Sequence, residues 1–301
     1  MKNIVIIGLG ALGCAYASKL HHMDPNRLQV IAGGARARRY KEEGFLINGK
    51  HFDFRYISPD EQCEPADLII VAVKGYQLAQ AVIDIKNHVG SNTVILSLLN
   101  GITSEEIIGK EYGMDKLLYA LSFGLTANRE GNQIHFTSYG NLAFGEKINL
   151  EYSQKVKDVK AVFEQAGIPF SIPQDMMRAI WWKFMVNVGI NQCSAITGGR
   201  YHVFQTVDEA KNLMESAMWE VVRISEKTGI HLNGRDIKKW YEILNTLYPD
   251  SRTSMLEDIE SGRKTEVDLF AGTVCEMGEK YGVDTPINRT LLNIIKVLER
   301  R

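Results

Sequence analysis

The sequence predicts an α/β protein with a doubly wound parallel sheet in its N-terminal part and an all-helical domain after it. In the first half, short β-branched runs alternate with helical stretches, and these runs are apolar throughout. Strands covered by helices on both faces have this uninterrupted hydrophobicity. Strand-like runs disappear after about Pro173. Because 301 residues are many for one hydrophobic core, we expect two domains, residues 1–172 and 173–301.

The expected elements follow from these patterns in chain order. The strands are expected at Asn3–Gly8, Leu28–Ala32, Leu68–Val73, Thr93–Leu98, Leu117–Ser122 and Leu142–Phe144. Helical patterns in the first domain cover Ala11–Leu20 and Tyr152–Ala166. The second domain is predicted to contain helices at Gln174–Ile196, Asp208–Lys227, Glu266–Tyr281 and Asn288–Leu298.

Composition and charge exclude several classes of protein. The formal net charge is -1, so no global basic field would attract nucleic acid or an anionic membrane. No apolar run is long enough to cross a bilayer, and the hydrophobic start leads into a glycine pattern rather than a signal-peptide cleavage site. The four cysteines are scattered, and no histidine has metal-ligand spacing. We therefore expect no metal site, and free thiols in a reducing cytoplasm.

A glycine-rich turn directly follows the first predicted strand. Gly8, Leu9, Gly10, Ala11, Leu12 and Gly13 form a GxGxxG pattern that opens a helix. In a Rossmann-type fold, the first glycine allows the tight turn, the second allows close approach of a pyrophosphate, and the third allows the helix to pack on the strand. The helix N-terminus then offers N–H groups to the phosphates. The alternative is a packing turn without a ligand.

The end of the second strand distinguishes between dinucleotide cofactors. An NAD site usually has a carboxylate about 20 residues beyond the glycines, but no acidic residue lies between Asp24 and Glu42. Small residues and Arg36 stand there instead, and a guanidinium can hold a 2′-phosphate through two hydrogen bonds. This pattern favours NADPH. Alternatively, Arg36 belongs to the solvated first turn of a helix, and the roles of Arg38 and Arg39 stay open.

Two further strand ends carry polar residues. Lys74 follows the run Leu68–Val73, and Asn100 follows Thr93–Leu99. Ligands of open α/β sheets bind at the carboxyl ends of the strands, so we place both residues, with Gln77, near the cofactor or substrate. Lys74 as a solvated cap of the sheet edge is the competing interpretation.

The predicted helix Gln174–Ile196 carries a polar stripe in apolar surroundings. Lys183, Asn187 and Asn191 are spaced by four residues and therefore share one face of the helix. Because a buried lysine is costly unless it is paired or functional, the stripe indicates a substrate site in a buried helix. A purely structural seam between helices is the alternative.

Together these motifs resemble the ketopantoate reductase family. The shared features are GLGALG, Lys74 in VKGYQ, Asn100 in LNG and the Lys183/Asn187/Asn191 helix, followed by SMLED at 254–258 and KTEVD at 264–268. They span nearly the whole chain. The resemblance implies NADPH-dependent reduction of a small 2-keto acid, 2-dehydropantoate, to pantoate in the pathway to pantothenate and coenzyme A.

The resemblance also implies roles for single residues. Lys183 corresponds to the general acid that protonates the ketone oxygen. The residues implied to hold substrate are Asn100, Asn187, Asn191, Ser254 and Glu266, with Glu266 receiving a substrate hydroxyl. The residues implied at the cofactor, besides the glycine turn and Arg36, are Lys74, Gln77, Asn100 and Glu266. From the sequence alone, a helix cap is the favoured interpretation of Ser254 and a surface acid that of Glu266, and only the resemblance implies their roles at the site.

Some features leave the function open. The segment before Asn100 ends Ser97-Leu98-Leu99, where the family often has glutamine directly before the asparagine. One rival is a paralogous reductase of another small 2-keto acid. Another is a non-catalytic NADPH sensor, although such a protein would not need Lys183 and its asparagines. Apolar helical faces in the second domain suit a homodimer and equally the core of a monomer.

Overall fold

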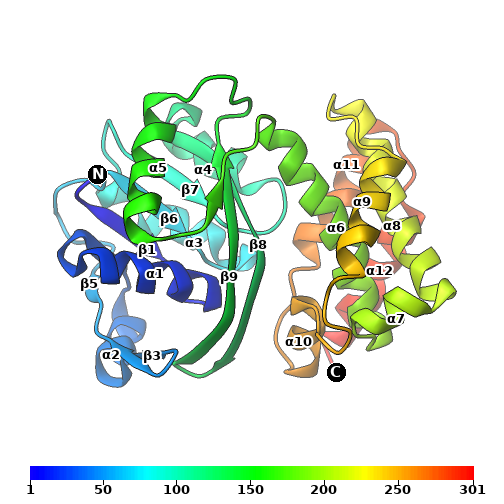
Figure 1. Ribbon diagram of the computed structural model, residues 1–301, viewed down its shortest axis with the longest axis horizontal. Helices are drawn as coiled ribbons and strands as arrows, with labels where there is room; N and C mark the ends of the chain where they lie inside the picture. Colours follow the sequence, from blue (N-terminus) through cyan, green and yellow to red (C-terminus); the bar gives the residue numbers. More distant parts are fainter. The chain divides into compact units, whose positions relative to one another are not determined.

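The computed structural model describes the backbone of all 301 residues, and the side chains of all except Thr126 and Asn128. The chain divides into two compact units, Met1–Met176 and Met177–Arg301. The boundary predicted after residue 172 lies in the same connection, shortly before the long helix α6. Figure 1 shows the strands in the first unit and only helices in the second.

The first unit alternates strands and helices, as predicted. Its strands are β1 (Ile4–Ile7), β2 (Leu28–Ile31), β3 (Phe45–Ile47), β4 (Lys50–Phe52), β5 (Arg55–Ile57), β6 (Leu68–Val71), β7 (Val94–Ser97), β8 (Leu117–Glu130), β9 (Gln133–Gly145) and β10 (Phe170–Ser171). Its helices are α1 (Ala11–Met23), α2 (Gly34–Glu43), α3 (Leu78–Asp84), α4 (Ser104–Tyr112) and α5 (Gln154–Ala166). Short 3₁₀ turns lie at Pro25–Arg27, Gly75–Gln77, Lys86–His88 and Met114–Lys116.

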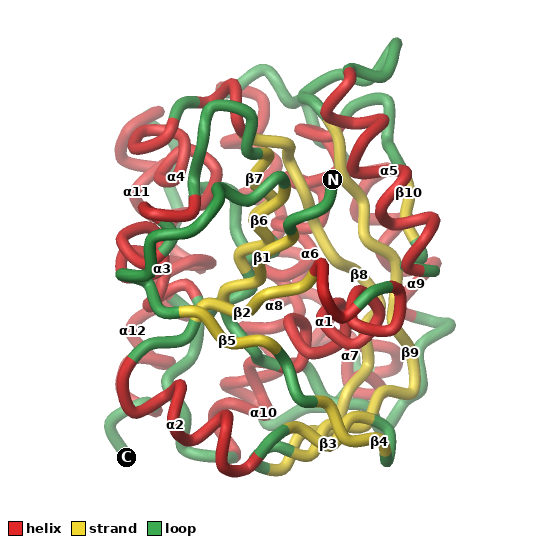
Figure 2. The backbone as a smooth tube through the Cα atoms, turned by 90° about the vertical axis from the view of Figure 1, so that its left-hand side faces the viewer, coloured by secondary structure: helices red, strands yellow, loops and turns green.

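The strands form one sheet in the order β4-β3-β9-β8-β7-β6-β1-β2-β5, with β10 paired to β9 (Figure 2). From β8 to β5 all neighbouring strands are parallel. The chain moves from β1 to β2 on one side and then to β6 on the other side. The strand order therefore reverses at β1, which is the point where open α/β sheets bind ligands.

Hydrophobic cores cover both faces of this sheet. Ile4 and Ile6 of β1 belong to the core that contains α1 and α5, whereas Val5 and Ile7 belong to the core that contains α3 and α4. Successive side chains of a strand point to opposite faces, so a strand between two helical layers must be apolar at every position. The doubly wound α/β fold is thus confirmed.

The sheet differs from the prediction in the short strands β3, β4, β5 and β10, which were not predicted, and in one long hairpin. The strands predicted at Leu117–Ser122 and Leu142–Phe144 are parts of β8 and β9, which pair antiparallel up to Glu130 and Gln133. In the outer part of β9, buried residues alternate with exposed ones. The hydrophobicity there is not continuous, so the uninterrupted apolar runs that predict fully buried strands do not extend over the outer part of the hairpin.

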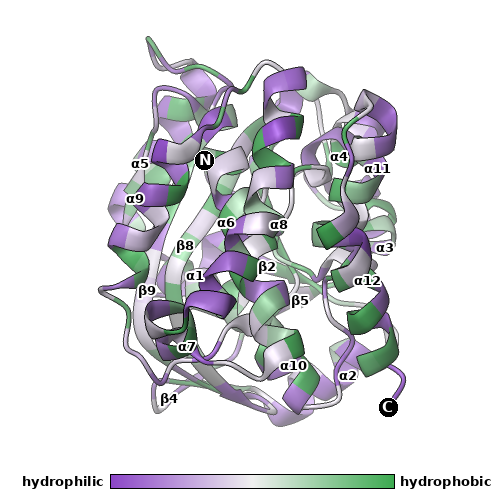
Figure 3. Cartoon of the chain, turned by 90° about the vertical axis from the view of Figure 1, so that its right-hand side faces the viewer, coloured by the Kyte–Doolittle hydropathy of each residue, from purple (hydrophilic) through white to green (hydrophobic). Residues whose placement is uncertain are grey.

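The second unit consists of helices, and their surfaces carry both hydrophobic and hydrophilic residues (Figure 3). They are α6 (Met176–Thr197), α7 (Tyr201–Thr206), α8 (Asp208–Lys227), α9 (Gly234–Leu244), α10 (Ser254–Glu260), α11 (Thr273–Tyr281) and α12 (Pro286–Leu298). The helix predicted over Glu266–Tyr281 begins two residues later and is not uniform, because it starts with a π-helical turn, η5 (Asp268–Gly272), and continues as α11. Among the described residues, no helix is both long and apolar enough to cross a membrane.

Candidate active site

The first unit gathers its predicted site residues at the carboxyl edge of the sheet. Ile7 of β1 pairs in register with Val71 of β6, and Val71 pairs with Ser97 of β7. Three residues beyond these partners stand Gly10, Lys74 and Asn100. Since parallel strands end at the same edge, the glycine turn, the lysine and the asparagine follow three adjacent strand ends.

The geometry of the glycine turn requires its first and third glycines. Gly8 has φ +99°, and a Cβ there would lie 2.6 Å from the carbonyl oxygen of Ala72. A Cβ on Gly13 would lie 1.9 Å from the carbonyl oxygen of Gly8. At Gly10 the nearest atom to such a Cβ is Nη1 of Arg129, at 4.0 Å. The fold therefore needs Gly8 and Gly13, whereas Gly10 leaves space beside the backbone.

Helix α1 begins directly at this space. Gly10 is its N-cap, the first turn holds no acidic residue, and among the described side chains none caps it. Its first N–H groups therefore point out of the helix without an intrahelical acceptor, a geometry that suits an anion. Inside the helix, burial raises the pKa of the Cys14 thiol to about 12, against a smaller opposing effect of Arg129. Cys14 is thus a neutral buried thiol rather than a nucleophile.

Arg129 is a residue of this edge that the sequence did not indicate. It comes from β8, and its Nη1 donates to the carbonyl oxygen of Leu9 at 2.9 Å while Nε donates to Gly131 at the same distance. These bonds use two of the five N–H groups of a guanidinium. A lone arginine in a polar strand carries no local signal that would connect it to a turn 120 residues earlier.

Arg36 lies in the first turn of α2, just beyond the end of β2, and is exposed. This location agrees with the structural alternative that we considered, a solvated first turn, and is compatible with a phosphate contact. The helix begins at Gly34 with positive φ, and Gly33 lies against Pro59. Small residues thus precede Arg36, as the sequence indicated.

Lys74 and Gln77 flank a short 3₁₀ turn after β6 and are half-buried. The backbone N–H of Lys74 donates to Oε1 of Gln77 at 3.2 Å, which fixes the start of the turn. Asn100 is also half-buried, three residues beyond β7. The three residues thus belong to the sheet edge rather than to a fully solvated surface.

In the second unit, α6 carries the lysine-asparagine stripe. Asn191 is buried, with 6% of its surface exposed, whereas Lys183 and Asn187 are half-buried. The expectation that the whole stripe is buried is therefore wrong for these two residues. Nδ2 of Asn191 donates to Oδ1 of Asn187 at 3.1 Å, so the two amides form one polar row on the helix.

Ser254 joins this row from α10. Its hydroxyl donates to Oδ1 of Asn191 at 3.1 Å, and the backbone N–H of Met255 lies 3.4 Å from the same oxygen. The cap of α10 is Thr253, whose side chain accepts from the backbone of Leu256. The alternative role of Ser254 as the helix cap is therefore wrong.

Glu266 is buried, with 8% of its surface exposed, just before the π-helical turn. Its alternative interpretation as a surface acid is therefore wrong as well. Asn187, Asn191 and Ser254 are connected by hydrogen bonds, while Glu266 comes from a separate segment. No group of three or more potential metal ligands occurs among the residues that the structure describes.

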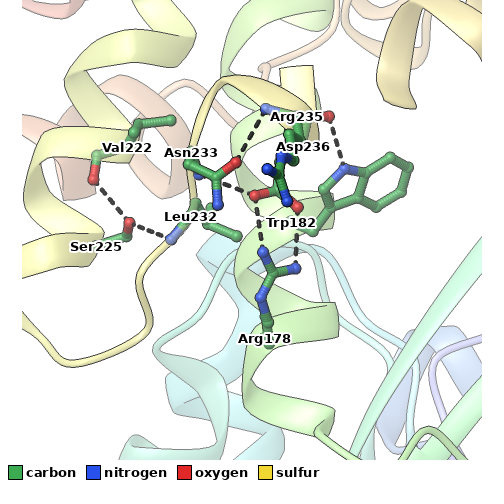
Figure 4. A network of polar contacts seen from close by, with 8 residues as sticks. All are labelled: Arg178, Trp182, Val222, Ser225, Leu232, Asn233, Arg235 and Asp236. Atoms are coloured by element: carbon green, nitrogen blue, oxygen red, sulfur yellow. Dashed lines mark hydrogen bonds and ion pairs between the residues drawn. The ribbon is translucent and has the colours of Figure 1, made fainter. Parts of the chain in front are cut away.

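The first turns of α6 are anchored to α9 (Figure 4). Arg178 donates to both carboxylate oxygens of Asp236, at 2.9 and 2.8 Å, and the indole of Trp182 donates to the carbonyl oxygen of Asp236 at 3.1 Å. Asp236 in turn accepts from the backbone of Asn233 at 2.8 Å. A two-bond arginine–carboxylate pair fixes direction as well as distance. Lys183 follows Trp182 directly and therefore stands on a fixed part of the helix.

A doubly wound sheet with a dinucleotide turn at its switch point, followed in the chain by a helix that displays a lysine-asparagine row, defines a dinucleotide-dependent oxidoreductase. Comparison with known families agrees. Residues 4–149 match the family model "Ketopantoate reductase PanE/ApbA" and residues 175–299 match "Ketopantoate reductase PanE/ApbA C terminal". The chain belongs to the ketopantoate reductase family, which confirms the resemblance seen in the sequence.

Individual relatives cover the whole chain. A 2-dehydropantoate 2-reductase of Aquifex aeolicus is 28% identical, over 99% of this chain and 97% of the relative. Among solved structures, a D-mandelate dehydrogenase with NADH and anilino(oxo)acetate is similar with a TM-score of 0.87 and 26% identity, over 99% of this chain and 98% of that one. A 2-dehydropantoate 2-reductase of Geobacter metallireducens has a TM-score of 0.86 at 23% identity, over 98% and 99%.

Proposed function

We propose that the protein is a 2-dehydropantoate 2-reductase, which reduces the ketone of 2-dehydropantoate to the alcohol of pantoate with NADPH. The observation that carries this proposal is the match of both halves of the chain to the two models of one family. The product serves the synthesis of pantothenate and coenzyme A.

The residues at the sheet edge fit a dinucleotide phosphate. Space beside Gly10 and the uncapped start of α1 suit the pyrophosphate, and the guanidinium of Arg129 adds positive charge over the same turn. Arg36 beyond β2 suits the 2′-phosphate. Lys74, Gln77 and Asn100 would contact the part of the cofactor at the neighbouring strand ends. We keep Glu266 as a contact of both cofactor and substrate, on the resemblance to the family.

Lys183 acts as the general acid in this proposal. NADPH, when bound, supplies the hydride to the carbonyl carbon. The ammonium of Lys183 donates a proton to the ketone oxygen and stabilises the negative charge that develops there. The hydrogen-bonded row of Asn187, Asn191 and Ser254 holds the substrate, and Glu266 accepts a hydrogen bond from its hydroxyl.

The similarity to D-mandelate dehydrogenase favours a second candidate, a reductase of another 2-keto acid. That structure contains NADH and an oxoacetate derivative. Mandelate differs from pantoate by an aromatic ring in place of a branched hydroxyalkyl group. The two candidates share the chemistry at the keto acid and differ in the group that the enzyme must hold beside it.

The deciding experiment measures initial rates with 2-dehydropantoate and with phenylglyoxylate, each with NADPH and with NADH. We expect kcat/KM to be highest for 2-dehydropantoate with NADPH. Turnover of phenylglyoxylate but not of 2-dehydropantoate would replace the first candidate by the second. Tight NADPH binding without turnover of any 2-keto acid would favour a sensor.

The cofactor preference has its own test at Arg36. We expect NADPH to exceed NADH by well over tenfold in kcat/KM, because basic and small residues follow β2 where an NAD site has an acid. Arg36→Ala should weaken NADPH and leave NADH almost unchanged. Arg39→Ala is the matched control, since the Arg39 guanidinium lies over the ring of Tyr40, 5.5 Å from its centre. Equal losses for both cofactors in Arg36→Ala would assign Arg36 another role.

Two wider expectations remain proposals. The four cysteines form no disulfide, which suits the cytoplasmic location that we propose. A homodimer is tested by sedimentation equilibrium of the purified protein, where a single monomeric species at micromolar concentration would exclude it.

A further inference from the structure

The amide of Gln192 lies at the centre of a buried network in the second unit. Gln192 follows Asn191 on α6 and has no exposed surface. Its Nε2 donates to the carbonyl oxygen of Val188 at 2.7 Å and to Oδ1 of Asn288 at 3.0 Å, and its Oε1 accepts from the backbone N–H of Ala271 at 3.0 Å. The network is thus built from α6, α12 and the π-helical turn η5.

The network fixes which way the Gln192 amide points. Glu220 is buried, with 1% exposed, and its carboxylate accepts from Nδ2 of Asn288 at 2.7 Å. Because a carboxylate only accepts, Nδ2 must face Glu220, and Oδ1 of Asn288 faces Gln192. Nε2 of Gln192 then faces Asn288, and its oxygen faces Ala271. Satisfied buried networks of this kind specify one arrangement of their elements.

Gln192 replaces one hydrogen bond of the helix that it touches. In an α-helix, the N–H of Ala271 would donate to the carbonyl oxygen of Val267, four residues earlier. Here that oxygen accepts instead from Gly272, five residues later, at 3.1 Å and from Phe270, three residues later, at 3.2 Å. The N–H of Ala271 donates to Gln192. A side chain that inserts into the i→i−4 ladder of a helix disturbs its regular geometry. The extra residue in η5 is therefore held by Gln192.

Glu266 lies two residues before the start of this turn, between two fixed points. Its carbonyl oxygen accepts from Leu269 at 2.9 Å. On the preceding side, the backbone and hydroxyl of Thr265 donate to Oε1 of Glu299, at 2.8 and 2.6 Å. On the following side, the turn is attached to α6 through Gln192. Returning η5 to a regular α-helix would remove the extra residue and rotate Glu266 relative to α11 by about 100°.

We propose that Gln192 is a positioning residue for Glu266: by holding the π-helical turn to α6, it aims the carboxylate at the substrate hydroxyl. This inference rests on the proposed function, in which Glu266 accepts that hydroxyl. Gln192 touches neither substrate nor cofactor. It connects the helix that carries Asn187 and Asn191 to the segment that carries Glu266, so that the two sets of substrate contacts keep one spacing.

The test compares 2-dehydropantoate with 3,3-dimethyl-2-oxobutanoate, the same keto acid without the hydroxyl. The ratio of their kcat/KM values measures recognition of the hydroxyl and does not depend on the fraction of enzyme that is folded. In the wild type we expect a ratio of at least about tenfold, because a hydrogen bond to a buried charged group contributes at least that factor to binding. Glu266→Gln should reduce it. Gln192→Met should reduce it to within about threefold of the Glu266→Gln ratio. Its Kd for NADPH should change no more than that of Glu266→Gln, because the other proposed cofactor contacts lie in the first unit.

Two further variants separate positioning from stability. The buried carboxyl of Gln192→Glu should stay protonated, so it keeps an acceptor for Ala271 and a donor for Oδ1 of Asn288 and should retain most of the ratio. Ser194→Ala removes another buried hydrogen bond of α6, from Oγ to the carbonyl oxygen of Gly199 at 2.6 Å, and should lower the melting temperature while keeping the ratio. The inference would be overturned if Gln192→Met kept the wild-type ratio, if Gln192→Glu lost it, or if Glu266→Gln left it unchanged. Failure of the wild type to reduce 2-dehydropantoate would instead contradict the proposed function.

Discussion

Lys183 is half-buried on a helix whose residues around it are almost all buried. Trp181 and Phe184 are in the core, and Trp182 is bonded to Asp236, so the backbone at Lys183 has little freedom. A long flexible side chain on a fixed backbone can reach a substrate atom. The partly exposed position thus suits a proton donor better than full burial would, since burial disfavours the charged form of lysine.

Replacing this lysine tests the chemical step. Lys183→Ala should lower kcat by roughly 10²–10⁴-fold, the range for loss of a general acid. Wild-type reduction should fall as pH rises through the pKa of the acid, and this limb of the pH profile should be absent in the variant. NADPH affinity, measured by fluorescence titration, should be retained. Lys239→Ala is the control, since it removes an exposed lysine that lies 5.0 Å from the ring centre of Trp182. Near-normal kcat in folded Lys183→Ala would assign the proton to another donor, and Lys74 would be tested next.

Ser254 and Asn191 differ in what the fold requires of them. Both are proposed as ground-state contacts, so alanine should raise KM for the keto acid more than it lowers kcat. Asn191 is buried and bonded to Asn187 and Ser254, so Asn191→Ala should also cost about 1–3 kcal/mol of unfolding free energy. Ser254→Ala should lower the unfolding free energy by much less than Asn191→Ala, because Ser254 is exposed and Thr253 is the helix cap. Unfolding curves in urea separate the two effects, and an unchanged KM in folded Ser254→Ala would remove it from the site.

At the scale of elements, the β1–α1 connection shows two different uses of glycine. Gly13 lets the helix approach the strand, while Gly10 leaves space beside the backbone, where the proposed function places the pyrophosphate. The sequence motif presents both as the same residue type. Only the surroundings of each Cβ position distinguish the packing role from the binding role.

This difference predicts opposite outcomes for two alanine variants. Gly13→Ala would place its methyl group 1.9 Å from the carbonyl oxygen of Gly8, so the melting temperature should drop sharply, corresponding to about 3 kcal/mol or more. Gly10→Ala has φ -72° and meets nothing closer than 4.0 Å, so it should melt near the wild type yet bind NADPH at least about tenfold more weakly. Calorimetry and NADPH titration on the same samples provide both values. Full NADPH affinity in Gly10→Ala would show that the phosphate does not approach there.

At the scale of the whole molecule, the start of the chain is attached to the sheet by Asp67, just before β6. Its carboxylate accepts from the backbone N–H groups of Lys2 and Asn3, the latter at 3.1 Å. Burial raises the pKa of Asp67, but these hydrogen bonds, the N-terminal ammonium and Arg27 outweigh it, so the pKa lies below its ordinary value. Around this pKa the unfolded chain binds more protons than the folded one.

The sign of the pH dependence follows. The contribution of Asp67 is complete above the ordinary pKa of aspartate and is lost as pH falls through the lowered pKa of the folded state. The difference in unfolding free energy between the wild type and Asp67→Asn should therefore shrink on acidification below about pH 4. Urea titrations from neutral pH to about pH 2 measure it. A difference that stays constant with pH would mean that Asp67 does not titrate differently in the folded and unfolded chain.

The sequence by itself determined the features that local pattern encodes. Uninterrupted apolar runs predicted the parallel strands, and glycine spacing predicted the turn between β1 and α1. The regular spacing of Lys183, Asn187 and Asn191 predicted one polar face on α6. Each of these signals lies within a single segment, because the conformation of a strand, a turn or a helix depends mainly on its own residues and on which face is apolar.

The tertiary structure alone decided what depends on contacts between distant segments. Arg129 reaches the glycine turn across 120 residues. Gln192 accepts a backbone hydrogen bond from the helix 79 residues later, whose first turn is π-helical. It also decided that Glu266 is buried and that Thr253, not Ser254, is the cap of α10. The conformational preference of a single segment does not determine these contacts. A buried N–H or carboxylate forms a hydrogen bond with the partner that the packing of the whole unit places next to it.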